Sequence, residues 1–398
     1  MLLLYFMDGL KFEMAEKYMP YLSSLNMRPL KSDFGYSCAC HATMYTGKNI
    51  DEHNTWFVWK KGENSPYWFV DKVPFLKYLN CIPIKVLVSK AARKINRNTS
   101  FSGIPMLVNL PLKYWSSFEP CEDTFWTADG YMPKFETLFK ILRKKKVPHQ
   151  IVGLSKDGDV FAEEKGVDYQ KDDFVYYFIG EVDSYMHKYG ECAAESIAYL
   201  KKTDEFIKKT CEKAKATGKP VTVVCYSDHG HIDVEKKIDV NDYFKVRGLD
   251  VRKYLQLTES TFIRFWFRNQ QERIEVAQVL EDMQKEGVGF VLDSEIRKKY
   301  HLCFDSNEHG DLVFHLRAPN IFTNTIWGFG KTIKSMHGYD PELPKHYGVF
   351  AANQEIIEKD FVHLTDILPT ILTDLGIDRA PYLLTGANVL KCREIENE

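Results

Sequence analysis

The chain has 398 residues, of which 44% are hydrophobic and 14% aromatic, and its 53 basic and 55 acidic residues give a formal net charge of -2. A chain of this length and apolar content can bury a large core, which favours one large α/β domain with sizeable insertions. The balanced charge gives no argument for a nucleic-acid polymer or an anionic membrane as a partner. The sequence gives no evidence for either kind of partner without excluding them, and it leaves the oligomeric state open.

The first seven residues, MLLLYFM, are apolar but too short to span a bilayer. They lack a basic leader and a cleavage site and run directly into Asp8, so we interpret them as a buried strand. The nine cysteines are odd in number and have no CxxC spacing, which fits reduced thiols. The sequence therefore predicts a cytoplasmic protein.

Apolar runs alternate with helical patterns along much of the chain, which predicts a mostly parallel central sheet sandwiched by helices. In chain order, the predicted elements are a strand at Leu2–Met7, helices at Phe12–Leu25, Ser37–Thr46 and Phe135–Lys146, strands at Gln150–Leu154 and Phe174–Ile179, a helix at Ala193–Thr217, a strand at Val221–Tyr226 and a helix at Leu364–Leu375. Gly47 and Gly376 follow two of these helices, as glycine commonly does at a helix C-terminus.

Two stretches interrupt this rhythm. Residues 57–130 are rich in aromatic residues and prolines, and we interpret them as an inserted cap. Residues 236–330 contain strand-like segments and a helix near Gln271–Glu286, which predicts a small α+β insertion. The remaining segments, 1–56, 131–235 and 331–398, would then form the core domain.

Acidic and imidazole-bearing residues follow the predicted strands. Asp8, Asp183 and Asp228 each lie just past a strand, and His229 is adjacent to Asp228. In open α/β sheets functional groups collect at the carboxyl ends of the strands, so these side chains can meet. His187 follows Asp183 by four residues, which places both on one ion if a helical turn begins there. Carboxylates with neutral imidazoles predict a site for zinc-like divalent ions.

Each of these segments has a plainer interpretation when it is taken alone. Asp8 with Gly9 is the sequence of an ordinary turn. Asp183 with His187 fits a surface helix, and Ser37 fits the N-cap of the helix that begins there. The order and spacing of all the segments together favour a functional site.

That order resembles the alkaline phosphatase superfamily, and within it the nucleotide pyrophosphatase/phosphodiesterase-like branch. In that branch the nucleophile is followed by a histidine, a Thr-Gly pair and a second histidine, which here are His41, Thr46, Gly47 and His53 after Ser37. A DSxxHxxG segment matches Asp183 to Gly190, a DHG segment matches Asp228 to Gly230, and an HGYD segment begins at His337. The resemblance implies an alkaline phosphatase-like catalytic core.

The resemblance also implies two divalent metal ions. One would be held by Asp183, His187 and His337. The other would be held by the remaining ligands, which are Asp8, Asp228, His229 and the oxygen of Ser37. It implies zinc, with manganese as the alternative. Ser37 would attack phosphorus and form a phosphoserine intermediate, activated by its bond to a metal ion.

The chain departs from the branch beyond His53. The branch places a phosphate-binding asparagine where this chain has Val58, so Asn54 and Lys60 are only weak candidates for binding substrate. We expect His231 and His346 to lie on the surface or beside the ligands rather than to bind metal.

The leading hypothesis is a metal-dependent phosphoric ester hydrolase, most similar to phosphodiesterases and nucleotide pyrophosphatases, that acts on a small-molecule phosphate ester. The alternatives that keep the same site are a phosphomonoesterase and a phosphotransferase or mutase. A further alternative is a binding protein that retains the fold without catalysis.

Overall fold

The computed structural model describes residues 1–73, 75–96, 107–122, 124–155, 158–327 and 332–391. The chain forms two compact units. Unit 1 comprises Met1–Asn49, Trp126–Asp233 and Ile333–Glu398, and unit 2 comprises Ile50–Phe125 and Val234–Thr332. Most of the predicted cap and of the predicted α+β insertion belongs to unit 2. The predicted boundary at 330 and 331 and the predicted end at 398 lie outside the described residues.

Seven strands form the central sheet of unit 1, in the order β17-β2-β16-β7-β1-β6-β5. β1 (Leu2–Met7) lies between β6 (Phe174–Ile179) and β7 (Thr222–Tyr226) and is parallel to both. Beyond β6, β5 (His149–Val152) continues the parallel run. The carboxyl ends of these four strands therefore lie along one edge of the sheet.

The other side of the sheet contains strands that the sequence did not reveal. β16 (Gly348–Ala352) is antiparallel to both β7 and β2 (Asn26–Lys31). The edge strand β17 (Val362–His363) is parallel to β2. Four of the six strand pairs are parallel, so the predicted fold class, a mostly parallel sheet sandwiched by helices, is confirmed.

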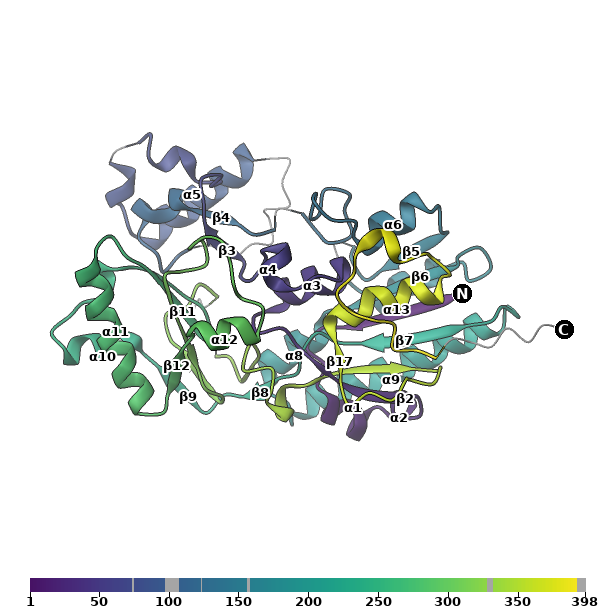
Figure 1. The fold of residues 1–398 in the computed structure, drawn as a ribbon. Coiled ribbons are helices and arrows are strands. Elements are labelled where there is room, and N and C mark those ends of the chain that lie inside the picture. Colours follow the sequence, from purple (N-terminus) through teal and green to yellow (C-terminus); the bar gives the residue numbers. More distant parts are fainter. Residues whose placement is uncertain (74, 97–106, 123, 156–157, 328–331, 392–398) are drawn as a thin grey trace. The chain divides into compact units, whose positions relative to one another are not determined.

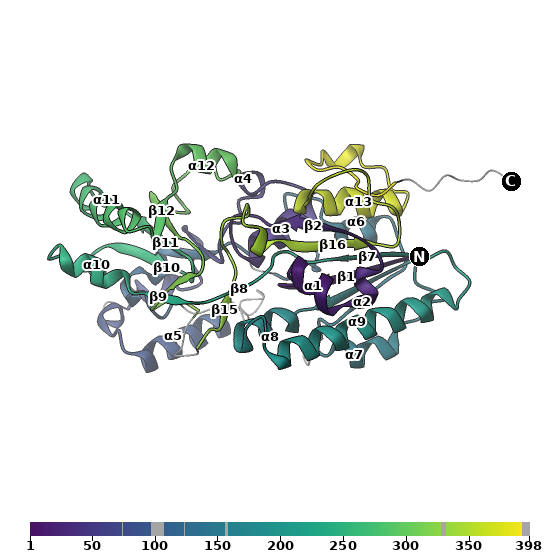
Figure 2. The same cartoon turned by 90° about the horizontal axis from the view of Figure 1, so that it is seen from below.

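Alternate side chains of β1 belong to two different cores, which explains why the whole strand is apolar. Leu2, Leu4 and Phe6 pack in one cluster, and Leu3, Tyr5 and Met7 pack in the other. Helices cover both faces of the sheet (Figures 1 and 2). The first cluster contains residues of α3 (Ser37–Thr46), α6 (Leu138–Lys144) and α13 (Ile367–Asp374), and the second contains residues of α1 (Phe12–Tyr18), α2 (Pro20–Ser23), α8 (Glu181–Tyr189) and α9 (Ala194–Lys215).

The helix predicted over Phe12–Leu25 is wrong, because two short helices, α1 and α2, occupy this segment. Proline disfavours helical backbone at the preceding residue and has no amide hydrogen to donate. Met19, just before Pro20, accordingly leaves the helical region with φ -123° and ψ 78°. The other predicted helices are present within a few residues of their expected ends.

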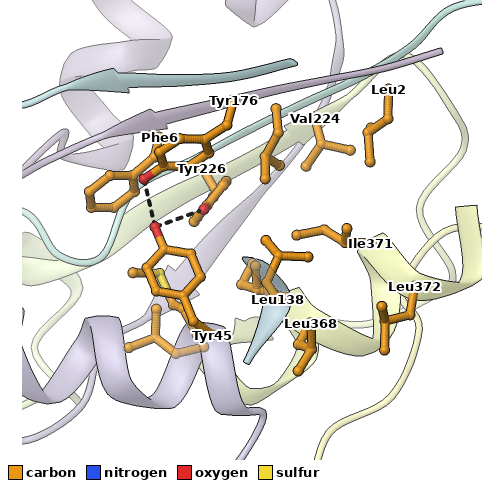
Figure 3. Close-up of a cluster of buried hydrophobic side chains, with 14 of the residues drawn as sticks. Leu2, Phe6, Tyr45, Leu138, Tyr176, Val224, Tyr226, Leu368, Ile371 and Leu372 are labelled. Atoms are coloured by element: carbon orange, nitrogen blue, oxygen red, sulfur yellow. Dashed lines mark hydrogen bonds between the residues drawn. The ribbon is translucent and has the colours of Figure 1, made fainter. Parts of the chain in front are cut away.

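Three buried tyrosines hold α3 on the sheet (Figure 3). The hydroxyl of Tyr45 in α3 lies 2.7 Å from the Tyr176 hydroxyl of β6 and 3.4 Å from the Tyr226 hydroxyl of β7. All three side chains are essentially inaccessible to solvent. This contact fixes the helix whose first residue is Ser37.

Unit 2 contains a four-stranded sheet in the order β10-β11-β13-β12. These strands are Leu255–Thr258, Phe262–Trp266, Leu312–Leu316 and Gly289–Val291, respectively. The helix α11 (Gln270–Lys285) contributes Val276, Val279 and Leu280 to their core.

The remaining helices and strands are short, apart from α5. The helices are α4 (Ile50–His53), α5 (Ile82–Ile95), α7 (Val160–Glu163), α10 (Val240–Val246) and α12 (Ser294–Lys299). The strands are β3 (Trp59–Lys61), β4 (Phe118–Pro120), β8 (Ile232–Asp233), β9 (Lys236–Ile238), β14 (Asn320–Phe322) and β15 (Ser335–Met336). Among the described residues, none of the helices combines the length and apolar character needed to cross a bilayer.

Candidate metal centre

Three neighbouring strand ends place three carboxylates at one edge of the sheet in unit 1. Asp8 directly follows β1, and its amide donates to the carbonyl of Ile179 at the end of β6. Asp228 lies two residues past β7, and Asp183 lies in the first turn of α8, which follows β6. The parallel order of these strands therefore brings together residues that are far apart in sequence.

Asp8, Asp228 and His229 form one group whose potential ligand atoms all lie within 4.8 Å of one another. Nε2 of His229 is 3.2 Å from Oδ2 of Asp228 and 3.8 Å from Oδ1 of Asp8. The other oxygen of Asp228 accepts hydrogen bonds from the amides of Gly9 and His229, both at 3.1 Å. These bonds fix the carboxylate and leave its second oxygen directed at the group.

Asp183 lies at the centre of a second set of contacts. Its Oδ1 is 3.2 Å from Nε2 of His187, 2.9 Å from Nε2 of His231 and 3.7 Å from Nε2 of His337. Asp183 and His187 lie one turn apart on α8, as the helical spacing predicted. The ring of His337 stacks on that of His229, with centroids 3.8 Å apart, so the two sets adjoin.

Ser37 is the first residue of α3, after Tyr36 in extended conformation. Its Oγ lies 3.0 Å from Nε2 of His229. The first-turn amides of a helix point toward its N-terminus and favour an anion there. The structure thus brings together Ser37 and all of the metal ligands expected from the sequence, whose roles remain predictions.

The carboxylate charges at this site repel one another unless a cation is present. Burial raises the pKa of Asp8 well above its usual value, and the charges of Asp228 and Asp183 raise it further. Burial also raises the pKa of Asp228, with the opposing effect of His229 being smaller. Burial acts to raise the pKa of Asp183 as well, but the adjacent His187 and His231 outweigh it, and that pKa lies well below its usual value.

Unpaired oxygens provide a test of whether these residues fit metal ions. Oδ1 of Asp8 and Oδ2 of Asp228 are buried and have no hydrogen-bond partner among the described residues. Leaving buried carboxylate oxygens unpaired is costly, and a divalent ion satisfies such oxygens. The residues therefore fit a metal, with Asp8, Asp228 and His229 in one group and Asp183 with its histidines in the other.

The sequence predicted His231 to lie on the surface or beside the metal ligands, and the structure places it beside Asp183, with its Nε2 2.9 Å from Oδ1 of that residue. It is completely buried, and burial lowers its pKa to about 4. Its side chain groups with Asp183 and His187 as a set that could hold a metal ion. One sequence signal could have predicted that His231 joins this group. It is the second histidine in Asp228-His229-Gly230-His231, just past the strand end that supplies two predicted ligands.

The two weak candidates for substrate binding, Asn54 and Lys60, lie in unit 2, and both contact Glu308. The amide of Asn54 donates to Glu308 at 2.6 Å, and the ammonium of Lys60 lies 2.7 Å from the same carboxylate. His309 also hydrogen-bonds Asn54, at 3.0 Å. These contacts give both side chains a structural role within unit 2, and their role toward substrate stays a prediction.

A family model for type I phosphodiesterase/nucleotide pyrophosphatase matches residues 2–340. The chain belongs to this family. As a member of the type I phosphodiesterase/nucleotide pyrophosphatase family, it is a hydrolase that acts on phosphoric ester bonds. The grouped carboxylates and imidazoles agree with the family's dependence on two metal ions.

Solved structures show the same fold at low sequence identity. Human ectonucleotide pyrophosphatase/phosphodiesterase 5 is 14% identical with a TM-score of 0.60, and the match covers 95% of each chain. The murine protein is also 14% identical with a TM-score of 0.60, covering 98% of this chain and 96% of that one. An inactive form of the murine protein in complex with AMP gives a TM-score of 0.59. No curated protein matches the sequence significantly.

Proposed function

We propose that this phosphodiesterase-family enzyme cleaves phosphodiester or pyrophosphate bonds in small nucleotide-like molecules, with Ser37 as the nucleophile and two divalent metal ions as cofactors. The observation that carries the proposal is the position of Ser37 Oγ, 3.0 Å from Nε2 of His229 and beside two groups of carboxylates and imidazoles. A serine in such a position can attack phosphorus once its proton is removed.

The chain's own residues can support the attack of Ser37 on phosphorus and the departure of the leaving group. Asp8, Asp228 and His229 would hold one ion. Asp183 would hold the other with His187 and His337, whose Nε2 atoms lie 3.2 Å and 3.7 Å from its Oδ1. Bound ions supply positive charge that favours the serine alkoxide and stabilises the attacking and leaving oxygens. The N-terminus of α3 favours the phosphoryl oxygens, because helix amides point at them. Ser37 would carry the phosphoryl group until water releases it.

Zinc fits the nitrogen and oxygen donors of these residues, with manganese as the alternative. A nucleotide-like substrate is supported by the related murine fold, which was solved in complex with AMP. A phosphomonoesterase is a second candidate, because Val58 occupies the place where the resemblance expects a phosphate-binding asparagine. A phosphotransferase would use the same serine with an alcohol as acceptor.

A substrate panel with controlled metal content tests the proposal. Protein stripped with a chelator and reloaded with zinc or manganese should hydrolyse bis-p-nitrophenyl phosphate and dinucleotide pyrophosphates, whereas the stripped protein should not. Hydrolysis should exceed that of p-nitrophenyl phosphate, and added alcohols should not divert the product. Turnover of monoesters alone would refute the diesterase assignment, and turnover by the stripped protein would refute the role of metal.

A further inference from the structure

We infer that unit 2 has a surface that docks on membranes containing anionic lipids. This basic aromatic surface is formed by the exposed side chains of residues 68–73 and 75–95, a segment that includes α5, labelled in Figure 1. All of these residues belong to unit 2, whereas the candidate metal centre belongs to unit 1. Membrane docking therefore goes beyond the proposed function and does not depend on it.

Large apolar side chains are exposed in this segment at an unusual density. Among the described residues, twelve large apolar side chains are exposed, and seven of them lie here. Tyr78 is 71% exposed, Phe75 68% and Leu87 63%. The other four are Trp68, Leu79, Ile82 and Ile95. A single exposed apolar residue needs no explanation, but a cluster of them marks a surface that contacts a partner or a membrane.

α5 exposes apolar and basic side chains on the face opposite to its packed face. Val88 and Ala92 are buried in the core of unit 2. On the opposite face, Leu87, Lys90 and Lys94 follow one another at helical spacing, and all three are exposed. A surface helix of a soluble protein ordinarily has polar residues on this face. The stems of lysines can lie along lipid chains beside such a leucine while their ammonium groups reach the headgroups.

The segment is strongly basic although the whole chain is not. Residues 68–95 include six basic residues and one acidic residue, a net charge of +5, whereas the chain has a net charge of -2. The ammonium of Lys85 is buried and donates to the carbonyl of Val108 at 2.6 Å. The other five cations are Lys72, Lys77, Lys90, Arg93 and Lys94. None of these five forms an ion pair with a described residue, so their charge complements anionic headgroups.

Two of these cations lie beside exposed aromatic rings. The ammonium of Lys72 is 4.5 Å from the ring centroid of Trp68, and that of Lys77 is 5.5 Å from the ring centroid of Tyr78. Trp and Tyr favour the boundary between lipid and water, because one part of each ring system is apolar and another is polar. A lysine next to such a ring places its charge at the level of the headgroups.

The abundance of lysine favours a membrane over a protein partner. The buried centres of protein interfaces are depleted in lysine, because its ammonium group loses its hydration there. A bilayer surface accepts both kinds of side chain at once, with the apolar ones among the acyl chains and the cations among the headgroups. The mixture of exposed aromatic, aliphatic and lysine side chains therefore fits a lipid surface.

Co-sedimentation of the purified chain with vesicles tests membrane docking without measuring catalysis. The chain should bind vesicles of phosphatidylcholine and phosphatidylserine in a three-to-one ratio, and should bind vesicles of phosphatidylcholine alone at least about tenfold more weakly. About 0.5 M sodium chloride should release most of the bound protein, because salt screens exposed charges. Absence of binding to the mixed vesicles, or equal binding to both kinds, would overturn the inference.

A pair of charge-reversal variants tests whether the basic residues of α5 are responsible. Lys90→Glu/Lys94→Glu should weaken binding to the mixed vesicles more than about 25-fold, because each basic residue near an anionic surface contributes about fivefold. Lys201→Glu/Lys208→Glu changes two exposed lysines of α9 in unit 1 and alters the net charge equally. This control should bind nearly as wild type does. Equal losses in the two variants would show that net charge alone drives binding and would overturn the inference.

A pair of apolar variants tests insertion into the lipid. Leu87→Ser should weaken binding at least about fivefold, because the apolar side chain no longer gains from burial. Ile274→Ser is the control, since Ile274 is 44% exposed on α11, a helix with four acidic and two basic residues. It should bind as wild type does, and undiminished binding by Leu87→Ser would overturn the inference. A dimer that Leu87→Ser dissociates, without vesicle binding, would overturn it too and assign the surface to a second copy of the chain.

Discussion

Asp33 is a carboxyl group near the start of α3 whose surroundings favour its protonated form. Burial raises the pKa of Asp33 to about 7, and the hydrogen bond donated by Thr43 only partly opposes this. The unfolded chain would lose this proton near pH 4. The folded protein therefore binds more protons than the unfolded chain between about pH 4 and 7.

This difference predicts that stability falls as pH rises through that window. Asp33→Asn cannot ionise, so its free energy of unfolding relative to wild type should increase by up to about 2 kcal/mol between pH 5 and pH 7. Urea unfolding of both metal-free proteins at these two pH values measures the change. An identical pH dependence in the two proteins would show that Asp33 is ionised throughout.

Among the helices and strands, the sequence predicted those that have a clear apolar pattern. β1 and β6 are continuous apolar runs, and α3 ends at Gly47, which adopts φ 66°. β2 was not predicted because its sequence, NMRPLK, contains a proline and polar residues. The strand is mostly half-buried, so it has no continuous apolar run. β16 is only five residues long and follows a short 3-10 helix at Pro344–His346, so no periodicity distinguishes it.

The turn after β1 has a glycine that the metal centre requires. Gly9 has φ 71°, and a Cβ atom there would lie 2.7 Å from His231. Gly9→Ala should therefore lower the free energy of unfolding by more than about 1 kcal/mol and weaken zinc binding. Gly218→Ala is the matched control, because Gly218 has φ 78° but open space around it. Chemical unfolding and zinc titration of both variants separate backbone strain from crowding, and equal losses in the two would contradict a role for Gly9 at the centre.

At the scale of the molecule, the order of the strands could be anticipated only in part. The motifs placed Asp8, Asp183 and Asp228 after strands, and the parallel sheet does bring them to one edge. The contacts of His231 depend on Ser335, more than 100 residues away, and no local pattern reveals such a pairing. The partners of Asn54 and Lys60 likewise come from Glu308, far along the chain.

The proposed function requires Ser37 to attack phosphorus beside bound metal ions. The most direct test is the rate of bis-p-nitrophenyl phosphate hydrolysis by zinc-loaded wild type and Ser37→Ala, with zinc content determined on the same samples. Ser32→Ala serves as control, because Ser32 is a buried serine in the preceding loop that contacts Cys40. We predict that Ser37→Ala loses several orders of magnitude in rate while it retains zinc, and that Ser32→Ala stays near wild type. A zinc-loaded Ser37→Ala protein with the wild-type rate would show that Ser37 is not the nucleophile.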